Sequence, residues 1–126
     1  MRIFYSPDGS DPMLLDSKHG LHAIHEVLRA FLSSSETAAV FPAATDGSPA
    51  PYAGFLRGLR LAKSAGGVRV TIAADGWLVF EGSRTELEKC VSKFLLEEDD
   101  GHAHLYTKPV SLVIESDGLS GSGLAS

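Results

Sequence analysis

The sequence predicts a single α+β domain of two layers, in which two helices cover one face of a largely antiparallel sheet. Two segments carry apolar residues at helical spacing, and several short segments alternate apolar and polar residues as strands do. The length fits one domain, because a chain of 126 residues can bury one hydrophobic core. We expect this domain to cover residues 1–115 and the Gly- and Ser-rich residues 116–126 to form a flexible tail.

The first half of the chain predicts a strand, a helix and a further strand. Residues 3–5 indicate the first strand, and Asp16 or Ser17 can cap a helix that ends near residue 33. The apolar stripe of this helix consists of Leu21, Ile24, Val27, Leu28, Phe31 and Leu32. Its other side carries His22, His25, Glu26 and Arg29. Residues 37–41 can form another strand, and the Pro-rich residues 42–51 indicate a loop.

Three strands, at residues 55–62, 67–73 and 77–81, are predicted to form a meander in which each strand pairs with the next. Asp75-Gly76 connects the last two of them. Asp-Gly between apolar segments is a strong hairpin signal, because both residues tolerate positive φ.

The second helix is predicted over residues 83–96. Ser83 and Glu86 have the spacing of a capping box, in which each side chain bonds a free backbone N–H of the first turn. The apolar stripe of this helix consists of Leu87, Cys90, Val91, Phe94 and Leu95. Two strands, at residues 102–107 and 110–115, complete the sheet.

Composition and charge narrow the classes of function. The net charge of −5 disfavours a nucleic-acid partner, because such proteins owe most of their affinity to Lys and Arg, and it suits a basic protein surface instead. Cys90 is the only cysteine, so no internal disulfide can form, and its place on a helix stripe indicates a core residue rather than a nucleophile. No segment has the length of a membrane span or a signal peptide, and we expect a cytoplasmic protein.

A candidate contact surface lies on the sheet face that the helices leave open. Because side chains alternate along a strand, Arg60 and Arg69 point away from the helices if their apolar neighbours face them. His102, His104 and Tyr106 share one face of their strand. These side chains can form a surface for a partner protein, or a solvated sheet face without a role.

The histidines also raise the alternative of a metal site. His102 and His104 are two residues apart in a strand, which places their Cα atoms about 7 Å apart. A zinc site needs three or four protein ligands. His19, His22 and His25 could add ligands only if the polar side of their helix met this strand, so we expect no metal. The chain also lacks phosphate-loop, dinucleotide-binding and serine-hydrolase motifs, and no cofactor is predicted.

An acidic run follows the second helix and consists of Glu97, Glu98, Asp99 and Asp100. Carboxylates at a helix C-terminus are disfavoured by about 0.3–1 kcal/mol each, because the helix dipole places negative charge there. The run is therefore either a solvated loop after the helix or a charged contact for a partner.

The order of these segments resembles a family of bacterial immunity proteins of polymorphic toxin systems. The resemblance covers about half of the chain, and its most distinctive part is His102-Ala103-His104-Leu105. The other similar segments are residues 55–61, 68–70, 78–83, the helix 84–96, the acidic run and Leu112-Val113-Ile114-Glu115. The resemblance implies an α+β protein that binds and neutralises a toxin domain. The connection at residues 106–109 is shorter than in the family pattern.

We therefore expect a binding protein rather than an enzyme, with a protein partner that is a cognate toxin domain and with its oligomeric state left open. The predicted contact residues are Glu97, Glu98, Asp99, Asp100, His102, His104, Arg60, Arg69 and Tyr106. Two alternatives remain: a small metal-dependent or acid/base enzyme that uses His102 and His104, and a housekeeping protein-interaction module. Convergent acids and bases in a pocket would favour the enzyme, and a flat, wet sheet face would favour a binding protein.

Overall fold

The computed structural model describes residues 1–96 and 101–117 and confirms the α+β class, with two helices and two mixed sheets. The strands are β1 (Arg2–Tyr5), β2 (Met13–Asp16), β3 (Ala38–Pro42), β4 (Gly54–Phe55), β5 (Gly58–Lys63), β6 (Arg69–Ile72), β7 (Trp77–Gly82), β8 (His102–Leu105) and β9 (Leu112–Ser116). The helices are α1 (Lys18–Ser33) and α2 (Arg84–Val91), and a short 3₁₀ helix, η1 (Ser92–Phe94), continues α2.

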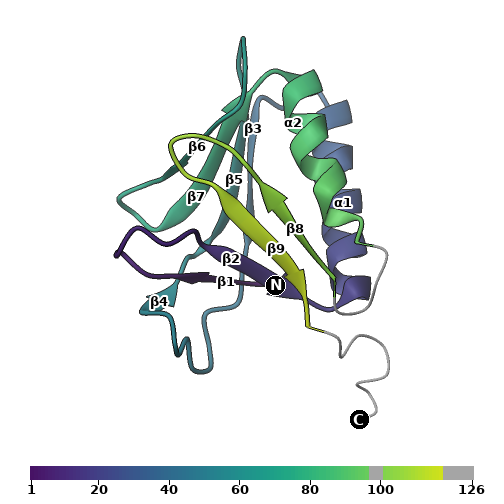
Figure 1. Cartoon of the computed structure of the whole chain (residues 1–126). Coiled ribbons are helices and arrows are strands. Elements are labelled where there is room, and N and C mark those ends of the chain that lie inside the picture. The colour runs from purple at the N-terminus through teal and green to yellow at the C-terminus, as the bar shows by residue number, and fades with distance from the viewer. Residues whose placement is uncertain (97–100, 118–126) are drawn as a thin grey trace.

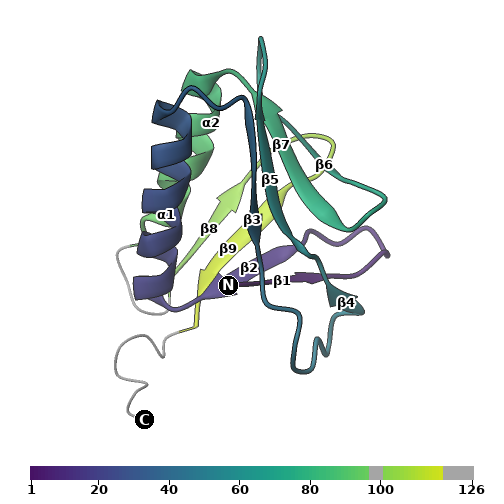
Figure 2. The same ribbon diagram turned by 180° about the vertical axis from the view of Figure 1, so that it is seen from behind.

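The sheet arrangement differs from the predicted single antiparallel sheet. A five-stranded sheet has the order β4-β1-β2-β9-β8, and a four-stranded sheet has the order β3-β5-β7-β6 (Figures 1 and 2). Each contains one parallel pair, β2 with β9 and β5 with β7. The predicted meander is therefore wrong: β6 and β7 form the expected hairpin, but β7 lies between β5 and β6.

The predicted strand at residues 55–62 is divided between the two sheets. Phe55 in β4 pairs with Phe4 of β1, whereas β5 starts at Gly58 and pairs with β3 and β7. Gly58 has a φ of 154°, a backbone conformation that residues other than glycine rarely adopt. Alternation of apolar residues indicated the strands here, but it does not show where a chain leaves one sheet for another.

The two sheets also meet at the edge of β6. The N–H of Val70 donates to the carbonyl of Lys108 at 3.0 Å, and the N–H of Val110 donates to the carbonyl of Val70 at 3.2 Å. The segment between β8 and β9 thus pairs with the outer edge of β6. This pairing fixes the C-terminal end of β8 relative to the four-stranded sheet.

Both helices begin at the predicted caps. The hydroxyl of Ser17 accepts a hydrogen bond from the N–H of Gly20 at 2.9 Å, and the hydroxyl of Ser83 accepts one from the N–H of Glu86 at 3.2 Å. The helices pack against each other on the same side of the sheets, as predicted (Figures 1 and 2).

The buried stripe of α1 differs from the predicted one at three positions, one of which is Ile24, predicted inside but only partly buried. The buried residues are Leu21, His25, Leu28, Phe31 and Leu32. Val27, predicted inside, is 53% exposed, and His25, predicted outside, is buried. Residues 21, 25, 28 and 32 repeat at intervals of four and three, so the helix buries one narrow face, and position 27 falls outside it. The Nδ1 atom of His25 lies 3.2 Å from a carboxylate oxygen of Glu26, which provides this buried ring with a polar partner.

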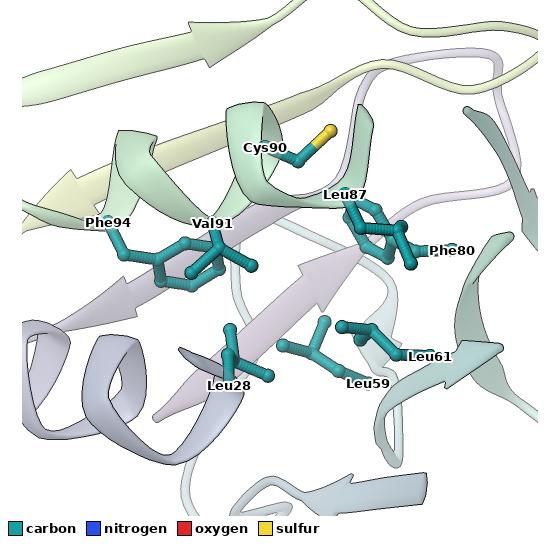
Figure 3. A pocket seen from close by; sticks show the side chains of 8 residues that line it. All are labelled: Leu28, Leu59, Leu61, Phe80, Leu87, Cys90, Val91 and Phe94. Atoms are coloured by element: carbon teal, nitrogen blue, oxygen red, sulfur yellow. The ribbon is translucent and has the colours of Figure 1, made fainter. Parts of the chain in front are cut away.

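Apolar side chains from both helices and from β5 and β7 meet in the core. They surround a cavity of about 10 Å³ and are Leu28, Leu59, Leu61, Phe80, Leu87, Cys90, Val91 and Phe94 (Figure 3). A cavity of this size holds at most about one water molecule, and its apolar lining disfavours even that one. The cavity is a packing gap rather than a ligand site.

Cys90 is predicted to react slowly with thiol reagents in the folded protein. It is 5% exposed, and burial raises the pKa of its thiol, as does the nearby charge of Glu86. The thiolate is the reactive form, so both effects slow the reaction. We expect labelling at least about 100-fold slower than in denaturant, because the thiol must wait for local opening. Fast labelling of the native protein would contradict this expectation.

Candidate partner-binding surface

The structure places the predicted contact residues of the described ranges on two different sheets. Arg60 and Arg69 belong to β5 and β6 of the four-stranded sheet, whereas His102 and His104 belong to β8 of the five-stranded sheet. The expectation that one open sheet face gathers them is therefore wrong, because the chain forms two sheets. The acidic run 97–100 lies outside the described residues.

Arg60 is engaged within the chain. A guanidinium nitrogen donates to the carboxylate of Asp75 at 3.0 Å, and the guanidinium carbon lies 5.5 Å from the ring centroid of Trp77. The hydrogen bond from Arg60 holds the pKa of Asp75 below its ordinary value. These contacts fasten the turn after β6 to β5, so the structure gives Arg60 a role within the fold. Arg69 is exposed and stands opposite Glu81 of β7 in the strand register.

Three side chains of β8 and its C-terminal end form a row, which we name the β8 surface: His102, His104 and Tyr106. The rings of His104 and Tyr106 stack with centroids 5.2 Å apart and an angle of 10° between their planes. The ring of His102 lies edge-on to His104, with centroids 6.4 Å apart. Tyr106 is 84% exposed although its ring is held against His104. Sequence alternation predicted this shared face correctly.

A groove lies beside the β8 surface, between β8 and α2. It has a volume of about 270 Å³, and its lining consists of Val68, Glu86, Lys89, Cys90, Lys93, His104, Leu105, Tyr106 and Thr107. Lys89 and Lys93 are exposed, and together they outweigh the one carboxylate of the lining, Glu86, which pairs with Lys89. Residues four apart lie on the same face of a helix, and this spacing could have grouped the two lysines. No sequence signal showed that this face borders β8, so both were missed.

The groove contains residue types found in cysteine hydrolases, namely Cys90, His104 and Glu86. A nucleophilic cysteine needs a lowered pKa and a base within hydrogen-bond reach. Burial raises the pKa of Cys90, and among the described residues no hydrogen bond joins its thiol to His104. Within the described part of the chain, the geometry therefore gives the thiol no activating partner.

The histidines do not gather into a metal site within the described part of the chain. No group of three or more His, Cys, Asp or Glu residues there is close enough to hold one ion. The Nε2 atom of His22 lies 3.1 Å from the carbonyl oxygen of Leu96, and His25 is buried in the core next to Glu26. The histidines of α1 thus contact other groups and do not complete a site with His102 and His104.

Comparisons with models of protein families, with curated proteins and with solved structures find no match for this chain. In the ranges 1–96 and 101–117, no helix combines the length and the apolar character needed to cross a membrane.

Proposed function

We propose that this protein is a toxin-neutralising, immunity-type binding protein of a bacterial polymorphic toxin system, that it acts in the cytoplasm, and that its partner contacts the β8 surface. The observation that carries the contact site is Tyr106, which is 84% exposed yet stacked on His104. Aromatic residues dominate the energetics of protein interfaces. A ring that is already held in place loses less conformational entropy when a partner covers it.

The toxin partner is supported by the family resemblance and by charge. The resemblance includes His102-Ala103-His104-Leu105, which is the sequence of β8. The net charge of −5 favours encounter with a basic toxin domain, since opposite charges raise association rates. We assign this steering role to the acidic run 97–100. The groove with its buried thiol gives the enzyme alternative no comparable support.

Co-expression with the proteins encoded next to this one tests the proposal. Any neighbour that kills cells when expressed alone should be tolerated when this chain is present, and the two proteins should purify together. Protection without a complex would contradict direct neutralisation. If no neighbour is neutralised and none binds, the immunity proposal is wrong, and a housekeeping interaction module remains.

Replacing Tyr106 or His104 with alanine is predicted to speed dissociation of the complex at least about tenfold, because close contacts at an interface act mainly on dissociation. Val40→Ala is a matched control, since Val40 is also an exposed strand residue, at 51%, but belongs to the other sheet. Surface plasmon resonance of purified variants measures both rates. Equal dissociation rates for Tyr106→Ala and Val40→Ala would place the interface elsewhere.

A further inference from the structure

The four edges of the two sheets differ in their ability to accept another strand. β4 has only two residues. In β3, the N–H of Ala43 donates to the carbonyl of Arg57, on the side of β5. Because backbone groups alternate along a strand, the preceding residue, Pro42, occupies an outward position, where it has no N–H to offer. β6 is bonded through Val70 to the segment between β8 and β9. These are the common ways in which proteins protect sheet edges. The remaining edge is β8.

The outer edge of β8 carries free hydrogen-bonding groups. The N–H of Ser116 donates to the carbonyl of Gly101 at 2.8 Å, and Ala103 stands opposite Ile114 in the same antiparallel ladder. Backbone groups alternate in such a ladder, so those of His102 and His104 point away from β9. Within residues 1–96 and 101–117, no backbone hydrogen bond joins the N–H or the carbonyl of His104 to another residue.

The groove borders this edge, and α2 forms its opposite wall. Lys89 of α2 and Lys93 of η1, which continues α2, line the groove on that side. Lys89 is 2.9 Å from a carboxylate oxygen of Glu86, and Lys93 makes no ion pair with a described residue. The groove therefore combines a free strand edge on one side with positive charge on the other. An exposed sheet edge is a common place for an extended peptide to add as a further strand.

We propose that this groove binds an extended segment with acidic side chains, which adds to β8 as a further strand. Its backbone pairs with the outward N–H and carbonyl groups of His104, and its carboxylates face Lys89 and Lys93. This inference rests on the proposed function, because the segment would belong to the partner that covers the β8 surface. The overall negative charge of the protein would then attract basic surface of that partner, whereas the positive charge of the groove would bind its acidic segment.

Selection from a phage-displayed library of short random peptides against the full chain tests the inference without any toxin. We expect enrichment of peptides that contain Asp or Glu in an otherwise strand-forming sequence. Lys89→Glu/Lys93→Glu should weaken the enriched peptides by about 10- to 100-fold, because it replaces attraction with repulsion. Enrichment of basic or uncharged peptides, or no enrichment, would overturn the proposal.

Two substitutions at one position separate backbone pairing from side-chain contact. His104→Pro removes the ring and the outward N–H but no bond of the β8–β9 ladder, whereas His104→Ala removes only the ring. Loss of one backbone hydrogen bond corresponds to about a tenfold loss of affinity, so the proline variant should bind about tenfold more weakly than the alanine variant. Equal affinities would overturn strand addition.

Hydrogen exchange in the unmodified chain provides a measurement that does not depend on folding of the proline variant. The amide of His104 should exchange more slowly when an enriched peptide is bound, and an unchanged rate would overturn the proposal. Peptide binding without neutralisation of any neighbour would leave the groove assigned and remove the immunity function. Neutralisation without peptide binding would overturn the groove proposal and leave the immunity function in place.

Discussion

Replacing Phe94 with alanine should lower the free energy of unfolding by about 3–5 kcal/mol, the usual cost of removing a buried phenylalanine. Phe94 is 2% exposed and is among the largest fully buried side chains. It stands with Leu28 and Val91 around the core cavity, where α1 and η1 meet (Figure 3). Truncation would enlarge an existing gap that rigid neighbours cannot fill.

Leu95→Ala is the matched control for Phe94→Ala. Leu95 is the next residue and was predicted to lie on the same apolar stripe, but it is 42% exposed. Its truncation should cost about 1 kcal/mol or less, because little area is lost from the core. Denaturant unfolding followed by circular dichroism measures both values. Comparable losses of unfolding free energy for the two variants would contradict the burial of Phe94 and the exposure of Leu95.

Gly58→Ala should destabilise the fold by about 2–5 kcal/mol, through backbone strain and overpacking together. A Cβ atom at Gly58 would overlap the carbonyl oxygen of Phe41 and lie 2.7 Å from the ring of Trp77 and 2.8 Å from the Cα of Pro42. Two of these contacts are with the backbone of β3, which cannot move without disturbing its pairing with β5.

Gly54→Ala tests whether the effect is specific to Gly58. Gly54 lies four residues before Gly58, in β4, and nothing lies within 4 Å of the Cβ position there. Its substitution should change the free energy of unfolding by less than about 1 kcal/mol. If Gly58→Ala lowers the free energy of unfolding no more than Gly54→Ala does, the close approach of β3 to Gly58 is absent.

Local chemistry was sufficient to predict most of the elements. Ser17 and Ser83 cap the two helices, because a hydroxyl at that position satisfies a free N–H of the first turn whatever surrounds it. Asp75-Gly76 lies in the hairpin connection between β6 and β7, where Gly76 has a positive φ and Asp75 does not. These features depend on neighbours within a few residues, so they can be predicted from the sequence alone.

The candidate site was predicted in part for the same reason. Alternation along β8 places His102, His104 and Tyr106 on one face, as predicted. The lysines of the groove, Lys89 of α2 and Lys93 of η1, were not predicted. Their proximity to β8 depends on how the helix packs, which no spacing within either segment encodes.

The sequence by itself determined the α+β class, the caps, the hairpin and the shared face of β8, all of which follow from local periodicity and turn chemistry. Only the tertiary structure decided that there are two sheets, that β7 lies between β5 and β6, and that His25 rather than Val27 faces the core. It also separated Arg60 from His104 and brought Lys93 next to β8. Strand order and helix rotation depend on which apolar surfaces pack best across long separations, and one strand or helix pattern is compatible with several such arrangements.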